Sequence, residues 1–241
     1  MVVDALAGLE VGPALDGAAA RLLRSLPPGE AAEALDDLVS GTAGAREQKA
    51  LIALCRAIHF GDPPLGDEPR QLILRSARSL GFGAVTSLFT RAGAERVIAR
   101  ADTPERIERK QGTSTLGHRT QTARAERNRD RLVRLALDPD PAVIRNLLLN
   151  PRVTEALVLR IASRRPVDGE VLETVARSEK WSKRPAVRRA LAQNPYAPPS
   201  LANSLLPTLN LTELGELATS PTVHPAVRNA AKALVAARRG E

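Results

Sequence analysis

The sequence predicts an all-α protein whose C-terminal half is an array of repeated short helices. Three observations support this fold class. Hydrophobic residues make up 43% of the 241 residues but aromatic ones only 2%, so Ala, Leu and Val supply the apolar mass. Ala and Leu are strong helix formers, whereas sheets favour aromatic and β-branched side chains. Apolar residues also recur at helical spacing between Pro and Gly residues, and a Pro-Ala-Val signature occurs three times in the C-terminal half.

The first 100 residues are expected to form an N-terminal helical region. In its first predicted helix, Leu15, Leu22 and Leu26 share one apolar stripe. Asp67 is expected to cap a later helix, because an aspartate side chain accepts hydrogen bonds from the first free backbone N–H groups. The predicted helices cover residues 13–26, 28–39, 45–58, 67–80 and 81–92, with a turn at 61–64 and one or two helical turns at 94–99.

Residues 101–122 are predicted to form a basic polar hinge, because the run from Lys110 to His118 contains few residues that could enter a core. A helix is expected from about 120 to 137, polar in its first half and apolar from Leu132 onward. The predicted domains are therefore an N-terminal helical region (1–100), the hinge (101–122) and helical repeats (123–241).

The repeated signature begins at Pro141, Pro185 and Pro225, so successive copies start 44 and 40 residues apart. The first two copies share an Asn-Pro pair at the same offset, beginning at Asn150 and Asn194. Proline at the first helical position already has the φ that a helix needs, and a proline after a helix prevents its continuation. One unit cannot bury its apolar stripe alone, so the units are expected to stack into a solenoid. Further short helices are predicted at 154–162, 169–176, 200–206 and 212–218.

The run from Leu137 to Arg145, with its echoes at Pro185 and Pro225, resembles HEAT-type repeats and their bacterial leucine-rich-repeat-variant relatives over roughly residues 130–240. The resemblance implies an α-solenoid that serves as a binding scaffold. One bacterial variant of this kind carries an iron–sulfur cluster held by clustered cysteines, but this chain has only Cys55. Helical-repeat DNA glycosylases use aromatic and acidic residues in a concave cleft. Because this chain has few aromatic residues, a glycosylase-like enzyme is the least favoured alternative.

The positive charge lies in the second part of the chain. Residues 1–100 contain 11 basic and 12 acidic side chains, whereas residues 101–241 contain 24 basic and 15 acidic ones, a net charge of +9. A basic half beside a nearly neutral one indicates an acidic partner, such as an acidic protein surface, nucleic acid or an anionic membrane. The sequence favours a protein partner, and nucleic acid bound through arginine–phosphate contacts is the alternative.

Arginines of the repeats and of the basic segment before them are candidate partner-binding residues. Stacked repeats would align Arg145, either Arg188 or Arg189, and Arg228 along one surface, where guanidinium groups bind phosphates or carboxylates. The alternative is an internal ladder, in which these arginines bind aspartates such as Asp138 or the carbonyls at helix ends. Trp181, which lies among cations, is either an interface anchor or a ring packed over a repeat junction. The full candidate set is Arg119, Arg124, Arg127, Arg131, Arg145, Trp181, Arg188 and Arg228.

Motifs for catalysis and for metal binding are missing from the sequence, so neither an enzymatic activity nor a cofactor is expected. The three histidines are far apart and show no metal-ligand spacing, and one cysteine provides neither a zinc motif nor an intrachain disulfide. The sequence also shows no signal peptide and no apolar stretch of about 18 residues that could span a membrane. The chain is therefore expected to be a scaffold or adaptor of the bacterial cytoplasm.

Overall fold

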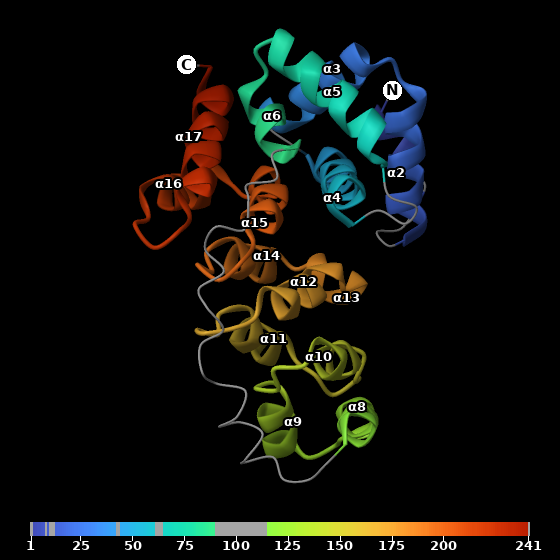
Figure 1. The fold of residues 1–241 in the computed structure, drawn as a ribbon, viewed down its shortest axis with the longest axis vertical. Coiled ribbons are helices and arrows are strands. Elements are labelled where there is room, and N and C mark those ends of the chain that lie inside the picture. Colours follow the sequence, from blue (N-terminus) through green and yellow to red (C-terminus); the bar gives the residue numbers. More distant parts are fainter. Residues whose placement is uncertain are drawn as a thin grey trace. The chain divides into compact units, whose positions relative to one another are not determined.

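Figure 1 shows the computed structural model, in which the described residues are 2–7, 9, 13–41, 44–60, 65–89 and 115–240. All regular elements of these residues are helices, which confirms the all-α prediction. The chain forms two compact units: unit 1 consists of Met1–Gly93 together with Pro199–Glu241, and unit 2 of Ala94–Pro198. The turn predicted at 61–64, the helical turns predicted at 94–99 and residues 101–114 of the predicted hinge lie outside the described residues.

Unit 1 combines the N-terminal helices with the last helices of the chain. Its helices are α1 (Val2–Ala7), α2 (Pro13–Ser25), α3 (Pro28–Ser40), α4 (Ala45–Phe60), α5 (Asp67–Ser79), α6 (Gly83–Phe89), α15 (Pro199–Leu205), α16 (Leu211–Thr219) and α17 (Pro225–Arg239), with a 3-10 turn at Leu206–Thr208. The ends of α2 to α5 agree with the predicted ranges to within two residues. These helix ends could be predicted from the sequence because Pro and Gly, which interrupt helices, lie near them.

Helix α4 forms the core of unit 1. Every residue from Ala50 to Ile58 is buried, because this stretch is apolar on nearly all sides and packs against several helices. It contacts α1, α2 and α15. The charged residue of the stretch, Arg56, donates from Nε to the Asp16 carboxylate of α2, at 2.9 Å from Oδ2 and 3.2 Å from Oδ1. The core of unit 1 therefore contains one buried ion pair among mostly apolar side chains.

Helix α17 connects the C-terminal segment to the N-terminal helices of unit 1. It contacts α3, α6 and α16. Near its end, Arg238 donates three hydrogen bonds to backbone carbonyls, at 3.0 Å to Val39, 2.6 Å to Leu209 and 2.5 Å to Pro207. The third copy of the repeat signature, which begins at Pro225, therefore belongs to unit 1. The compact units thus divide the chain at other places than the three predicted domains.

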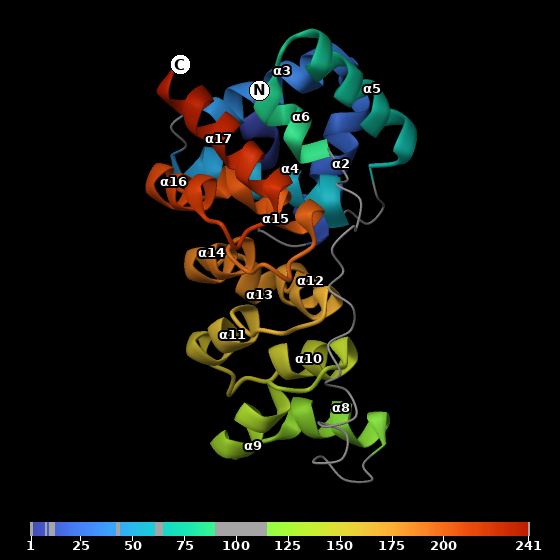
Figure 2. The same cartoon turned by 60° about the vertical axis from the view of Figure 1, so that its left-hand side comes forward.

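Unit 2 is built from shorter helices. They are α8 (Leu116–Ala125), α9 (Arg129–Leu135), α10 (Pro141–Leu148), α11 (Glu155–Ala162), α12 (Gly169–Arg177), α13 (Glu179–Ser182) and α14 (Pro185–Ala192). Within this unit, Figures 1 and 2 both show α8, α10 and α12 on one side and α9, α11 and α14 on the other. On the first side, α8 contacts α10 and α10 contacts α12. On the second side, α11 contacts α14.

The structure differs from the predicted hinge and from the predicted helix at 120–137. Residues 116–122 belong to α8, which begins after the N-cap Thr115 and so replaces the C-terminal part of the predicted hinge. The chain then breaks before α9, because the Asn128 side chain accepts hydrogen bonds from the backbone N–H groups of Asp130 and Arg131 and starts a second helix. The predicted single helix is therefore two helices joined by residues 126–128.

The Asn-Pro pairs of the repeat clamp one helix to another. Asn150 is 1% exposed, and its Nδ2 donates to the carbonyls of Ala123 and Glu126 at the end of α8, both at 2.9 Å. Asn194 is 3% exposed and donates in the same way to two carbonyls at the end of α11, at 2.7 and 3.1 Å. The last carbonyls of a helix have no partner within it, so each asparagine supplies missing donors. The offset shared by the two copies is explained by this contact.

Candidate partner-binding surface

The charge excess of the chain coincides with unit 2. Residues 94–198 contain 22 basic and 13 acidic side chains, a net charge of +9, whereas the residues of unit 1 contain 13 basic and 14 acidic ones, a net charge of −1. The sequence predicts the excess for residues 101–241, and residues 199–241 contribute only one net positive charge to it, from 4 basic and 3 acidic side chains. A surface for an acidic partner is therefore sought on unit 2.

Two of the repeat arginines bind helix ends rather than solvent. Arg188 is 2% exposed and donates to the carbonyls of Ser182 (3.1 Å) and Lys183 (2.9 Å) at the end of α13. Arg228, at the same position of the third copy, is half-buried in unit 1 and donates to the carbonyl of Ser220 after α16. Both residues therefore follow the alternative of an internal ladder, in which arginines bind the carbonyls at helix ends. A cation at the end of a helix also interacts favourably with the helix dipole. Arg188 and Arg228 are therefore removed from the candidate surface.

The first copy of the signature binds the preceding helix end in another way. Its equivalent residue is Ile144, which is fully buried and has no donor. The carbonyls after α9 are bound instead by Arg164, which follows α11 and donates to Ala136 (3.2 Å) and Asp138 (3.3 Å). In each copy, a guanidinium group therefore binds the carbonyls at the end of the helix that precedes the signature. The arginine that supplies this group does not occupy the same sequence position in every copy.

Trp181 is a packed ring and not an exposed anchor. It is 2% exposed, and its indole Nε1 donates to the carbonyl of Leu148 at 3.1 Å, so it ties α13 to the end of α10. The Lys180 ammonium lies 4.3 Å from the ring centroid. Trp181 is thus a ring packed over a repeat junction, because a partner cannot reach a side chain that is 2% exposed. Trp181 is removed from the candidate surface.

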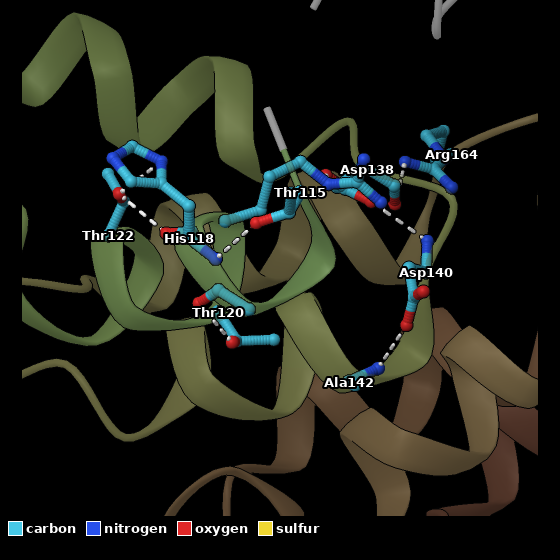
Figure 3. A network of polar contacts seen from close by, with 10 residues as sticks. Thr115, His118, Thr120, Thr122, Asp138, Asp140, Ala142 and Arg164 are labelled. Carbon is cyan, nitrogen blue, oxygen red and sulfur yellow. Dashed lines mark hydrogen bonds and ion pairs between the residues drawn. The ribbon is translucent and has the colours of Figure 1, made fainter. Parts of the chain in front are cut away.

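Arg119 belongs to a buried polar network around Asp138, which Figure 3 shows together with Asp140 and Arg164. Asp138 is fully buried, its Oδ1 accepts a hydrogen bond from the backbone N–H of Asp140 at 2.9 Å, and its Oδ2 lies 3.2 Å from Arg119 Nε. Thr115 caps α8 close by, through the backbone N–H of His118. Arg119 therefore contributes to the packing of α8 against the α9–α10 link, and we do not count it as part of the surface.

The charges of this network are perturbed mainly by burial. Burial raises the pKa of the Asp138 carboxyl, and the backbone N–H of Asp140 and the guanidinium of Arg119 offset part of that effect. Burial also lowers the pKa of Arg164, which the nearby Asp138 carboxylate partly offsets. At both groups burial therefore opposes the charged form more strongly than the neighbouring opposite charge favours it.

Among the described residues of unit 2, the exposed arginines are densest in one short stretch, which we name the α8–α9 arginine segment (residues 124–134). It runs from the last turn of α8 to the last turn of α9. Its arginines are all exposed and are Arg124, Arg127, Arg129, Arg131 and Arg134. The candidate set contained three of them. Arg129 and Arg134 were missed as site residues, although the charge count of the sequence already included them.

The α8–α9 arginine segment has an ordered backbone. Glu126 Oε1 accepts hydrogen bonds from the backbone N–H groups of Arg127 and Asn128, both at 2.8 Å. These bonds, that of Asn128 first, and the nearby Arg131 hold the pKa of Glu126 below its usual range. The Arg131 guanidinium lies 3.6 Å from Glu126, but its side chain stays 71% exposed. The arginines thus project from two helices and a fixed link.

The remaining candidate, Arg145 on α10, is exposed. The surface of unit 2 therefore retains Arg124, Arg127, Arg131 and Arg145 from the candidate set. Guanidinium groups bind carboxylates and phosphates through paired N–H donors, so this surface is suited to an acidic partner. The five Phe, Tyr and Trp residues of the chain all lie in the described part, and none of them is exposed. The surface is thus cationic without aromatic anchors.

The described residues offer neither a metal site nor a membrane-spanning helix. No group of three or more His, Cys, Asp and Glu side chains is placed there so that it could hold a metal ion. No helix among them is both long enough and apolar enough to cross a membrane. Comparison with known proteins adds no further candidate, because no protein-family model, no curated protein and no solved structure matches this chain.

Proposed function

We propose that this chain is a non-enzymatic scaffold or adaptor, an α-solenoid of HEAT-like repeats that binds an acidic macromolecule through the exposed arginines of unit 2. The observation that carries the proposal is the ordered α8–α9 arginine segment within a unit of net charge +9. A concentrated charge of one sign raises the local concentration of oppositely charged partners and speeds their association.

The repeated clamps in unit 2 support the solenoid part of the proposal. Asn150 and Asn194 occupy the same position in two copies of the repeat and bind the ends of α8 and α11 in the same manner. In a solenoid each unit contacts its neighbours through such recurring interactions, and the neighbours together form one extended surface. Function is then a property of the side chains displayed on that surface.

The proposed partner is an acidic protein or a nucleic acid, since both are polyanions that guanidinium groups bind. The proposed setting is the bacterial cytoplasm. The single cysteine, Cys55, is buried and not in a disulfide. A free thiol suits a reducing compartment.

Binding of the full chain to two labelled polyanions, poly-L-glutamate and a short DNA duplex, tests the proposal by fluorescence anisotropy at low salt. We expect at least one of them to bind, and a segment variant to lose most of that affinity. The segment variant replaces exposed arginines that have no role in the packing described above, by the substitutions Arg124→Ala, Arg127→Ala, Arg129→Ala and Arg134→Ala.

The matched control variant carries the same loss of charge on unit 1, by the substitutions Arg21→Ala, Arg24→Ala, Arg75→Ala and Arg78→Ala, all at exposed positions. It is expected to bind nearly as well as the unchanged chain, because its arginines lie on the unit without excess positive charge. If neither polyanion binds at low salt, the proposed function is wrong.

A further inference from the structure

We infer that the acidic partner is duplex nucleic acid, held by its phosphates at the α8–α9 arginine segment without readout of the base sequence. The inference rests on the proposed function and names the class of partner for the same surface.

The dimensions of the segment match a run of backbone phosphates. Helix α9 has seven residues, and at a rise of about 1.5 Å per residue its length is about 10 Å. A duplex carries one negative charge per ~1.7 Å of its axis, so about six phosphates lie along that length. Helix α9 offers three exposed guanidinium groups along this length, those of Arg129, Arg131 and Arg134, and Arg124 and Arg127 add two more on the preceding turn and link. The segment therefore presents several positive charges to a run of phosphates of similar length.

The state of the segment before binding also suits phosphates. The five guanidinium groups present paired N–H donors, which match the geometry of phosphate oxygens. The Glu126 carboxylate accepts hydrogen bonds from two backbone N–H groups. The exposed acidic side chain between the arginines is that of Asp130. Because the caps of α8 and α9 already fix the backbone, little backbone entropy remains to be lost when the ligand binds.

Single-stranded nucleic acid fits the surface less well than a duplex. Proteins that bind single strands without sequence preference stack the bases on exposed aromatic rings. Unit 2 contains two aromatic residues, of which Trp181 is buried and Tyr196 half-buried. Phosphate contacts to a duplex need no such rings, because the bases stay stacked on one another.

A folded acidic protein fits the segment less well for a different reason. The centre of a stable protein interface is usually apolar or aromatic, with charged residues at its rim. Among the described residues of unit 2, the exposed large apolar side chains are Leu116, Leu137 and Leu149, and none of them lies within residues 124–134. The segment therefore has the composition of a rim without an apolar centre, which is the composition expected for phosphate contacts.

The test compares four labelled probes with the full chain: two duplexes of unrelated sequence, one single strand of the same length and poly-L-glutamate. We expect the two duplexes to bind with similar affinity and more tightly than the other probes. If the segment neutralises about five phosphates, duplex affinity should fall by about 10²–10³-fold when the salt concentration rises from 50 to 200 mM. In the segment variant the slope of log affinity against log salt should fall by about 3–4, whereas the control variant should keep nearly the full slope.

Four results would overturn the inference. Tighter binding of poly-L-glutamate than of the duplexes would leave the proposed function standing and make the partner an acidic protein. Tighter binding of the single strand than of the duplexes would mean that the partner is single-stranded nucleic acid. An equal loss of duplex affinity in the segment variant and the control variant would place the contacts outside the segment. Binding of no probe would remove the inference and the proposed function together. If the segment variant does not fold, the milder Arg124→Gln/Arg134→Gln variant should lower the salt slope by about 2.

Discussion

The two units of this chain stabilise their helices by different means. Unit 1 contains the longest helix, α4, with 16 residues, and buries most of it among apolar side chains. The helices of unit 2 have between 4 and 10 residues. Every helix end leaves up to four backbone groups without a partner in the helix, so short helices have more such groups per residue. Unit 2 satisfies them with buried polar side chains, above all Asn150, Asn194 and Arg188.

This difference divides the arginines of unit 2 into two groups. Arg164 and Arg188 bind helix-end carbonyls and Arg119 faces a buried carboxylate, so these three belong to the packing of the unit. The arginines of the α8–α9 segment are exposed, and they are the ones that we propose to bind a partner. A high arginine content is therefore not by itself a sign of a binding surface in a unit of short helices.

The largest loss of stability is expected when the ion pair of unit 1 is broken. Arg56→Ala leaves Asp16, which is 5% exposed, buried without this guanidinium, and should destabilise the unit by about 3–5 kcal/mol. Burial raises the pKa of the Cys55 thiol to about 12. Iodoacetamide therefore alkylates the thiol only after the unit opens, and the urea concentration at which half of it reacts measures the loss.

A double variant, Asp16→Asn with Arg56→Met, separates charge from packing. It should recover part of the stability, because neither residue is then charged. If it opens at the same urea concentration as Arg56→Ala, the unpaired charge is not the cause of the loss.

A smaller loss, about 2–3 kcal/mol, is expected for Asn150→Ala in unit 2, because two buried carbonyls and the backbone N–H of Arg152 lose the side chain that binds them. Trp181, the one tryptophan of the chain, is buried in this unit, so its fluorescence in urea measures the loss. The control is Asn146→Ala, whose side chain bonds only to Ala142 of its own helix among the bonds described, and which should change stability by less than about 0.5 kcal/mol. Equal losses in the two variants would show that Asn150 is not a clamp.

Local patterns were sufficient for most helices but not for the roles of the arginines. Arg145 and Arg188 lie in two copies of the same signature, yet Arg145 is exposed and Arg188 is 2% exposed. The two arginines differ by one position in the signature, because the residue equivalent to Arg188 in the first copy is the buried Ile144. The sequence alone did not show which of these two positions faces a helix end, since that depends on a tertiary contact. The break between α8 and α9 was readable in principle, because Asn128 is a strong N-cap, but the polar run around it lacks the apolar periodicity that marks a helix boundary.

The division of the chain into two units could not be predicted from local sequence patterns either. The repeat signature predicted that the copy at Pro225 continues the array of the first two. The structure instead connects α17 to unit 1, where Arg238 bonds to Val39 across 199 residues of sequence. A short signature describes how one helix begins, whereas the choice of the helix that it packs against depends on distant residues.

The smallest effect is expected in the pH dependence of unit 2, and it concerns the Asp138 network. Burial raises the pKa of Asp138 above its value in the unfolded chain, so the folded state holds this proton more tightly than the unfolded state. The contribution of Asp138 to stability is then fully present below the unfolded pKa and declines as the pH rises through the folded pKa. The advantage of the unchanged chain over Asp138→Asn, measured by Trp181 fluorescence in urea, should therefore shrink as the pH rises above about 4. An advantage that grows over this range would mean that Arg119 and Arg164 outweigh burial, and the network would then stabilise unit 2 mainly as an ion cluster at neutral pH.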